Sequence, residues 1–338
     1  MKYDFETLID RRGRDAIAVE MIGKGVPWAS APKAPREGFT ALPMWVADMN
    51  FATAPSIPRA VKERADHALY GYFSPSLEYY RSIIEWQRSR NGVEGLTQEC
   101  IGYENGVLGC VSSAVQALTA PGEKILMHSP TYIGFTHVME DTGRYAELSP
   151  LVKDEEGIWR MDYEDMDRRL RENHIHLAIF CSPHNPCGRV WERGEIEKAM
   201  EIFRRNECVV ISDEIWSDIL LNGNRHIPTQ SVSEDARNRT IAIDAPSKTF
   251  NLAGLIGSYH IIYSAYLRDR VVSQSRVCHY NDMNVLSMHA LIGAYSGEGQ
   301  EWADELCSVL SENINYAYAF ILKNFPGVSV SRPQGTYM

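Results

Sequence analysis

The chain has 338 residues, of which 44% are hydrophobic, so it can bury a large core and is long enough for two domains. Its formal net charge of −10, without a basic cluster, disfavours nucleic acid and anionic membranes as partners. A charged N-terminus and the lack of any stretch near the roughly 20 apolar residues of a membrane span predict a soluble, cytoplasmic protein.

The seven cysteines are scattered and form no Cys-x-x-Cys pair. An odd number of unpaired cysteines is typical of reduced thiols in a cytosol and argues against disulfides and zinc sites. His174 and His176 flank Ile175 at strand-like spacing, but no carboxylate or cysteine is placed to complete a metal site. We therefore expect no bound metal.

In chain order, the residues up to about Pro43 are polar and broken by glycine and proline, which indicates an arm or part of a minor domain. Helical periodicity appears next in 56–69 and 77–90, with an aromatic turn at 70–75 between them. The region 283–324 is mostly helical in pattern, and 328–330 is predicted as a strand.

Between these regions, short apolar runs alternate with helical patterns. The predicted strands are 100–103, 124–128, 176–181, 208–212 and 240–243, and helices are expected from Val107 and around Ile196, Met200 and Phe203. Strand and helix alternating in this way predict an α/β fold, with a mainly parallel sheet that helices cover on both faces.

Lys248 lies just past the predicted strand 240–243, at the edge where open α/β sheets bind their ligands. Small and apolar residues come after it, so the amine is expected to be shielded from water. Shielding lowers the basicity of a lysine and makes it a usable nucleophile, above all for a Schiff base with pyridoxal phosphate. Taken alone, a surface lysine is an equally good interpretation.

The other strands also end in residues suited to that cofactor. A turn at Gly106 opens a helix whose free amides could hold a phosphate. Tyr132 could stack on a pyridine ring, and Asn185, between two prolines, could donate to a phenolate oxygen. Asp213 could pair with a protonated ring nitrogen, although a helix N-cap would explain it equally well. Together these residues supply a complete set of contacts at one sheet edge.

On these motifs, the chain resembles the fold type I pyridoxal phosphate enzymes of the aspartate aminotransferase superfamily. Within them it is similar to the MalY/PatB-like cystathionine β-lyase (carbon–sulfur lyase) branch. The motifs that carry the resemblance are Tyr3-Asp-Phe, Pro43-Met-Trp-Val-Ala-Asp-Met49, Ser182-Pro-His-Asn-Pro-Cys-Gly-Arg-Val-Trp191, Ser212-Asp-Glu-Ile-Trp-Ser-Asp218 and Ser247-Lys-Thr-Phe-Asn-Leu-Ala-Gly254.

The resemblance implies that Lys248 bonds covalently to the cofactor and is the catalytic residue. It implies further contacts to the ring and phosphate from a set of cofactor-binding residues: Asp213, Asn185, Tyr132, Gly106, Val107, Leu108, Ser247 and Trp216. It also implies a homodimer, because Tyr72 matches a tyrosine that the family contributes from the partner subunit.

The implied domains are an N-terminal arm with part of a small domain (1–45), a large cofactor-binding domain (46–282) and a small C-terminal domain (283–338).

The sequence departs from the family pattern at several positions. Ala245 stands where a phosphate-binding hydroxyl is usual, and Asn50 where a second acid is common. Trp216 replaces the tyrosine typical of aminotransferases, which favours the lyase branch. The sequence ends at Met338, inside a motif that the family continues toward its carboxylate-binding arginine, so the expected C-terminal domain is truncated.

The resemblance implies three alternative functions. The first is β-elimination on a sulfur-containing amino acid, which yields a thiol, pyruvate and ammonia. The second is amino transfer between an amino acid and a 2-keto acid. The third is a truncated, inactive regulator that binds the cofactor and acts by protein contact.

Overall fold

The structure is a computed structural model that describes residues 1–24 and 31–338. Contacts between residues divide the chain into two compact units, 1–53 and 54–338. The domain boundaries expected at residues 45 and 282 stay a prediction. In the first unit the described residues form one short helix, α1 (Ile17–Glu20), and are otherwise irregular, as their glycines and prolines predict.

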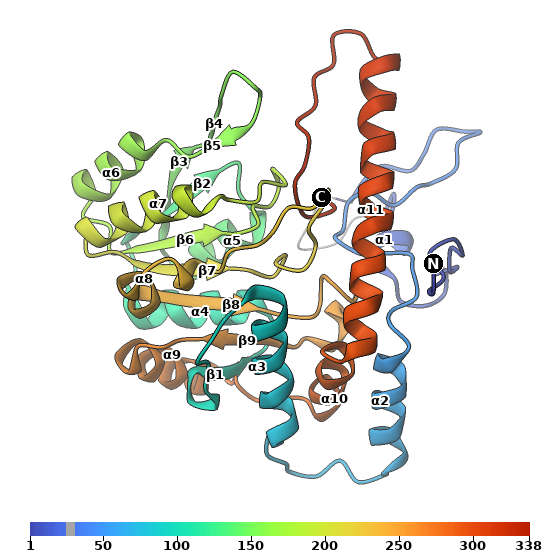
Figure 1. The fold of residues 1–338 in the computed structure, drawn as a ribbon, viewed down its shortest axis with the longest axis horizontal. Coiled ribbons are helices and arrows are strands. Elements are labelled where there is room, and N and C mark those ends of the chain that lie inside the picture. Colours follow the sequence, from blue (N-terminus) through green and yellow to red (C-terminus); the bar gives the residue numbers. More distant parts are fainter. Residues whose placement is uncertain (25–30) are drawn as a thin grey trace. The chain divides into compact units, whose positions relative to one another are not determined.

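The second unit is built on a seven-stranded sheet with the order β1-β9-β8-β7-β6-β2-β3 (Figure 1). Neighbouring strands from β8 to β3 are parallel, whereas β9 runs antiparallel to both β8 and β1. The strands of the sheet are β1 (Ile101–Glu104), β2 (Lys124–Ser129), β3 (Tyr145–Pro150), β6 (Leu177–Cys181), β7 (Val209–Asp213), β8 (Thr240–Asp244) and β9 (Ser258–Ile261). A separate hairpin pairs β4 (Val152–Lys153) with β5 (Trp159–Arg160).

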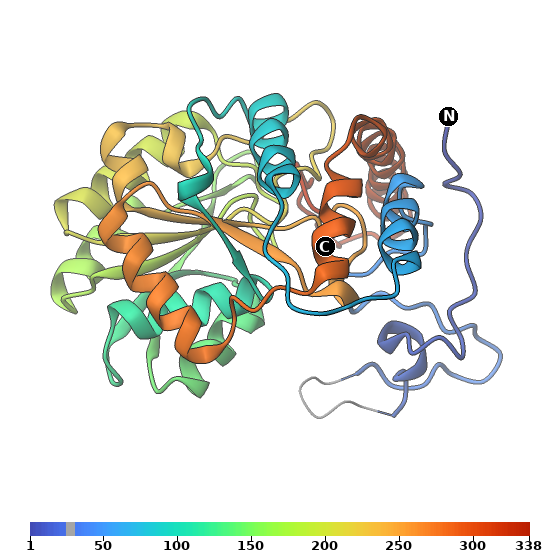
Figure 2. The same cartoon turned by 90° about the horizontal axis from the view of Figure 1, so that it is seen from below.

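Helices cover both faces of this sheet (Figure 2). The α-helices of this unit are α2 (Ser56–Asp66), α3 (Leu77–Asn91), α4 (Val107–Leu118), α5 (Ile133–Asp141), α6 (Tyr163–Glu172), α7 (Arg193–Arg205), α8 (Glu234–Arg239), α9 (Ala265–Cys278), α10 (Val285–Ala294) and α11 (Gly297–Asn324). Helix α4 packs against α5 and α9, and α7 packs against α6 and α8. Helices α2, α3 and α11 gather around α10. The predicted α/β fold with a mainly parallel, covered sheet is confirmed.

The core lies between the sheet and its helices. All five residues of β6 and of β8 are buried, as expected for central strands of a parallel sheet. On the side of α6 and α7, Phe180 of β6 packs with Trp191, Met166 and Phe203 in one apolar cluster. The buried strands therefore form a rigid support for the residues placed after them in the chain.

Two predicted elements differ from the structure. Helix α2 ends at Asp66 rather than at 69, because Arg64 turns its side chain onto the carbonyls of His67 and Leu69 and the chain leaves the helical conformation at His67. The strand predicted at 328–330 is wrong, because no described strand pairs with it. The last pairing of the chain is instead a single bridge between Leu220 and Gly335.

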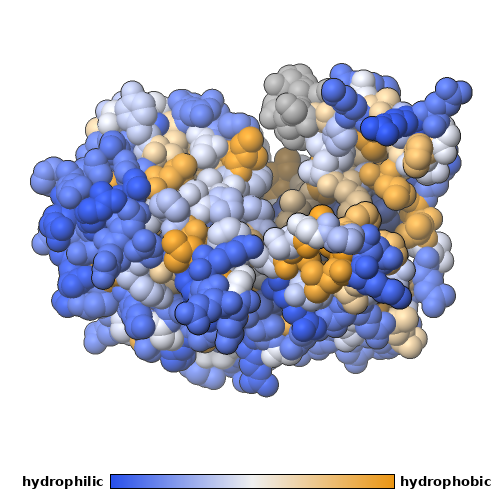
Figure 3. Space-filling model, turned by 90° about the horizontal axis from the view of Figure 1, so that it is seen from above, coloured by the Kyte–Doolittle hydropathy of each residue, from blue (hydrophilic) through white to orange (hydrophobic). Residues whose placement is uncertain are grey.

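On the face shown in Figure 3, hydrophilic residues dominate and apolar residues form small separate patches. No helix among the described residues combines the length and the apolar character that crossing a membrane requires.

Candidate active site

The parallel register brings the predicted site residues to one edge of the sheet. Cys181 of β6 pairs with Asp213 of β7, and Asp213 pairs with Ile243 of β8. Asn185 comes after β6 and Lys248 after β8, so both lie beyond the same carboxyl ends as Asp213. This edge is where open α/β sheets bind ligands.

Asp213 is a buried acid at the end of β7. Its side chain accepts a hydrogen bond from the amide of Ile215 (3.1 Å). Burial raises the pKa of Asp213 to about 7, although the Ile215 amide and the charge of Lys248 act in the opposite direction. A cation placed against this carboxylate would offset the cost of burying its charge.

Lys248 is half-buried beside two aromatic rings. Its Nζ lies 5.8 Å from the ring centroid of Trp216, which is buried and meets Tyr337 edge-on at 4.8 Å. The Tyr337 hydroxyl donates to the carbonyl of Lys248 (3.5 Å). Ser247, half-buried before the lysine, accepts a bond from the Leu252 amide at its carbonyl. The lysine therefore sits on a tightly held turn.

Hydrogen bonds to two buried acids hold the residues on either side of Lys248 in place. The Thr249 hydroxyl donates to Asp218 (3.2 Å), and the Ala245 amide donates to Asp244 (2.7 Å). Side chains of α3 reach the same acids: Trp86 donates to Asp218 (3.2 Å) and Gln87 to Asp244 (2.9 Å).

Burial raises the pKa of both Asp218 and Asp244. The charge of Asp218 raises the pKa of Asp244 further, whereas the Arg90 guanidinium opposes the rise at Asp218. The sequence gives no sign of this support, because α3 lies far from the lysine in the chain and carries no motif.

Asn185 is buried in a loop that the structure holds from several sides. Its amide lies 3.4 Å from the Cys181 sulfur, and the Asn185-Pro186 and Ser182-Pro183 bonds are cis. Further along the loop, Arg189 is buried and paired with Glu195 (2.6 Å). The loop thus places the Asn185 side chain at a defined position after β6.

Gly106, Val107 and Leu108 form the turn that opens α4. Gly106 has a φ of 76°, a conformation that L side chains rarely adopt, and α4 begins directly after it. The Gly106 amide donates to the Glu104 carbonyl (2.9 Å). The amides of Val107 and Leu108, at the start of α4, have no acceptor within the helix and can hold an anion. Ala245, where a hydroxyl was expected on family grounds, is buried and offers only its amide, which Asp244 already binds.

Tyr132 lies close to this turn. A Cβ built on Gly134 would fall 2.4 Å from the Tyr132 ring and 2.9 Å from Leu108, so these two side chains meet over Gly134. Burial raises the pKa of Tyr132, and the charge of Asp213 adds to that rise, which places the ring within electrostatic reach of Asp213.

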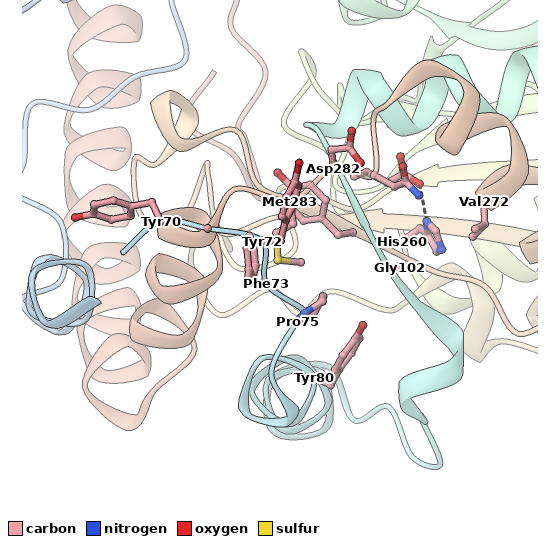
Figure 4. Close-up of a pocket in the computed structure, with 14 residues that line it drawn as sticks. Tyr70, Tyr72, Phe73, Pro75, Tyr80, Gly102, His260, Val272, Asp282 and Met283 are labelled. Atoms are coloured by element: carbon pink, nitrogen blue, oxygen red, sulfur yellow. Dashed lines mark hydrogen bonds and ion pairs between the residues drawn. The ribbon is translucent and has the colours of Figure 1, made fainter. Parts of the chain in front are cut away.

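Tyr72 is the predicted site residue that the resemblance assigns to a partner subunit. It is fully exposed and lines a cavity of about 730 Å³ that none of Lys248, Asp213 and Asn185 lines. Figure 4 shows Tyr72 beside Met283, with Tyr70 pointing away. At the floor of this cavity, His260 bonds to Glu104 (2.9 Å). A role for Tyr72 at Lys248 therefore requires a second chain.

The residue set fits pyridoxal phosphate. A planar, cationic ring nitrogen would offset the cost of burying the Asp213 carboxylate, and the amine of Lys248 lies past the adjacent strand. The opening turn of α4 offers amides for a phosphate without a basic side chain. Asp213, Lys248 and the α4 amides thus offer the charge, the amine and the hydrogen-bond donors that this cofactor needs.

The chain is similar to known proteins over most of its length. The family model described as Aminotransferase class I and II matches residues 46–338. Cystathionine beta-lyase PatB of Bacillus subtilis (strain 168) is 37% identical over 298 residues, which cover 88% of this chain and 76% of the relative.

Among the solved structures that resemble this chain are two that match it over its whole length. Cystalysin from Treponema denticola, which contains a pyridoxal 5'-phosphate cofactor, has a TM-score of 0.91 and 28% identity, and the match covers 100% of this chain and 83% of that one. The PLP-bound C-S lyase from Staphylococcus hominis has a TM-score of 0.88 and 30% identity, and the match covers 100% of this chain and 81% of that one.

Proposed function

The chain belongs to the aminotransferase class I and II family, and from this premise we propose that it is a pyridoxal phosphate-dependent carbon–sulfur β-lyase. It splits a sulfur-containing amino acid into a thiol, pyruvate and ammonia. The observation that carries the proposal is its likeness, over most of the chain, to a cystathionine β-lyase and to carbon–sulfur lyases.

The cofactor, when bound, supplies an electrophilic carbon for an amine and a ring that stabilises negative charge on the substrate's Cα. Lys248 Nζ would hold the cofactor covalently, and its free amine would take the proton from the substrate's Cα. This second role needs an amine with a near-neutral pKa. The Trp216 ring beside Nζ keeps water from one side of the amine.

The remaining residues bind and orient. Asp213 holds a proton on the ring nitrogen, and the side-chain amide of Asn185 donates to the ring oxygen. Tyr132 covers the ring face, which fits its position near Leu108 and within electrostatic reach of Asp213. The amides of Val107 and Leu108, which the Gly106 turn presents, hold the phosphate, assisted by the hydroxyl of Ser247.

An aminotransferase is the second candidate, because the matching family model is described by that activity. It uses Lys248 and Asp213 in the same way up to the loss of the Cα proton. The lyase then expels a thiolate from Cβ, whereas the aminotransferase keeps the side chain and returns the proton to a different carbon. Turnover of an amino acid without a leaving group on Cβ, dependent on an added 2-keto acid, would favour it over the lyase.

We also propose that the protein acts in the cytosol as a homodimer with shared active sites. All seven cysteines are free, which suits a reducing compartment. Leu69, Tyr70 and Tyr72 expose large apolar surfaces within a few residues of one another, as at protein interfaces. In the dimer, Tyr72 reaches the active site of the other chain.

The test has two parts. An absorbance spectrum of the purified protein with cofactor is recorded before and after borohydride, and mass mapping of the reduced peptides then locates the labelled residue. We expect a visible band that borohydride removes and a cofactor label on Lys248. The label should be absent in Lys248→Ala and unchanged in Lys62→Ala, which alters an exposed lysine on α2.

Pyruvate release from cystathionine or cystine measures the activity. We expect Lys248→Ala to lower it by at least about 10²–10⁴-fold, the usual contribution of a positioned acid or base. Full activity in Lys248→Ala, or a label on another lysine, contradicts the proposed role.

A further inference from the structure

The segment 334–337 contacts three parts of the chain that carry proposed site residues. Its backbone bonds to the loop after β6, which carries Asn185, and to the segment after β7, which carries Trp216. The Tyr337 hydroxyl bonds to the carbonyl of Lys248, and the Tyr337 ring packs edge-on against Trp216. One short segment therefore joins parts of the site that are far apart in sequence.

The bonds to the loop after β6 come from both the backbone and one side chain. The amides of Gln334 and Gly335 donate to the carbonyl of Gly188 (2.7 and 3.0 Å). The side-chain oxygen of Gln334 accepts from the Val190 amide (3.2 Å) and from the Arg189 guanidinium (2.5 Å). Gln334 thus bonds to three consecutive residues of the loop.

The segment and the loop approach each other too closely for side chains at Gly188 and Gly335. A Cβ added at Gly188 would fall 2.7 Å from the Pro333 ring and 3.0 Å from the Gly335 carbonyl oxygen. A Cβ added at Gly335 would fall 2.9 Å from the Val190 side chain. Because packed groups this close cannot slide past one another, the loop has little room to shift while the segment is in place.

The residues that the segment holds also determine where Asn185 lies. The His184 amide donates to the Arg189 carbonyl (2.7 Å), and the Gly188 amide donates to the His184 carbonyl (2.8 Å). Asn185 lies inside the turn that these two bonds close. Holding Gly188 and Arg189 in place therefore holds the backbone of Asn185 as well.

We propose that Gln334 is a positioning residue for Asn185. It acts through residues 188–190 and keeps the side-chain amide of Asn185 where it donates to the ring oxygen of the cofactor. The proposal rests on the proposed function, which assigns that donor role to Asn185. The family resemblance assigns no role to Gln334.

The first measurement is amide hydrogen exchange of the peptide 184–191 in the full chain incubated with pyridoxal phosphate. Gln334→Leu removes the side-chain acceptor and should raise the exchange rate about three- to tenfold, the effect of one lost hydrogen bond. Gln334→Glu keeps an oxygen acceptor and should restore the protection. If Gln334→Leu does not fold, Gln334→Ala takes its place, because it adds no apolar group.

Gln274→Leu is the matched control. This half-buried glutamine of α9 donates to the Cys278 sulfur (3.3 Å) and has no contact with the loop after β6. Its replacement should leave the exchange of the peptide 184–191 unchanged.

The second measurement is the pH at which the visible band of the cofactor-loaded protein changes. The band changes when the nitrogen that joins Lys248 to the cofactor loses its proton. A donor to the nearby ring oxygen takes up part of that oxygen's negative charge and weakens its hold on this proton. A misplaced Asn185 amide should therefore move the change to higher pH.

We expect Asn185→Ala to raise this midpoint by up to about one pH unit, the effect of one hydrogen bond, and Gln334→Leu to raise it by less. Gln334→Glu should return the midpoint to the wild-type value. In a chain that already carries Asn185→Ala, Gln334→Leu should add no further shift, because its effect passes through that side chain.

Three results would overturn the proposal: unchanged exchange in Gln334→Leu, an unchanged midpoint in Gln334→Leu, or shifts that simply add when Gln334→Leu and Asn185→Ala are combined. In a protein that carries the label on Lys248 and releases pyruvate, these results refute this proposal alone. A protein without that label refutes the proposed function, and this proposal with it.

Discussion

For Asp213, the sequence alone left two explanations open, and the structure bears on both. From the sequence, a cofactor partner and a helix N-cap were equally good explanations. In the structure its side chain does accept the Ile215 amide, as a local cap would, yet the residue is buried and its pKa is raised to about 7. Burial of this kind costs stability, and acids that bear such a cost are typical of functional sites.

The raised pKa of Asp213 predicts a pH-dependent stability of the cofactor-free chain. Between the ordinary value of 3.8 and about 7, the folded chain binds a proton here that the unfolded chain has released. The free energy of unfolding therefore falls as pH rises through this window, by up to about 1.4 kcal/mol per pH unit from this residue. Asp213→Asn should remove that part of the slope.

Urea unfolding of the two proteins at several pH values between about 4 and 7 measures the difference. The wild-type protein should lose more stability than the variant as pH rises. Asp218 and Asp244, whose pKa values are also raised, remain in both proteins and cancel. Identical slopes would show that Asp213 is not the titrating group.

At the residue scale, side chains directly after a strand could be placed from the sequence, whereas those packed beneath the strand ends could not. Lys248, Asp213 and Asn185 could be placed, because each comes at or just after the end of an apolar run that must be a buried strand. Tyr337 and the acids Asp218 and Asp244 could not be assigned roles, since their contacts to the lysine turn depend on tertiary packing.

At the scale of elements, the central strands were predicted to within a residue or so, because fully buried strands give unbroken apolar runs. β9 was missed: its sequence Ser258-Tyr-His-Ile261 places a histidine among buried residues and lacks such a run. The false strand at 328–330 shows the reverse case. Its β-branched residues favour an extended conformation, but no described strand pairs with it through backbone hydrogen bonds.

The pairing of β1 with β9 contains a contact that admits only glycine. Gly102 lies opposite His260, and a Cβ added at Gly102 would fall 2.3 Å from two ring atoms of that histidine. We expect Gly102→Ala to lower the free energy of unfolding by about 1–3 kcal/mol, the usual cost of overpacking a core.

A double-mutant cycle with His260→Ala isolates this clash. Removing the ring should make the added methyl group nearly harmless, so the double variant should be more stable than the sum of the two single effects predicts. Strictly additive losses in chemical denaturation would mean that the histidine is not what excludes a side chain at Gly102.

At the scale of the whole molecule, the exposed Tyr72 allows a test of whether each active site is shared between two chains or built from one. If the active sites are shared, Tyr72→Phe and Lys248→Ala damage different chains of the same site. A hybrid dimer then has one site that carries both changes and one that carries neither.

We expect Tyr72→Phe, like Lys248→Ala, to be inactive alone. Mixing the two variants, unfolded together and refolded, should then restore pyruvate release to about a quarter of the wild-type level, because half of the dimers are hybrids with one intact site. Each variant refolded with itself is the control. A mixture no more active than its components would indicate that every chain works with its own residues.

The position of β1 at the sheet edge has a consequence for how the chain is made. Among the described strands β1 pairs only with β9. Ile101 can therefore pair only after Ile261 has been synthesised and has left the ribosome. Contacts so distant in sequence are slow to form, because a long loop must close before they contribute. During synthesis the early strand would stay unpaired and prone to aggregation, which predicts that chaperones raise the yield of native protein.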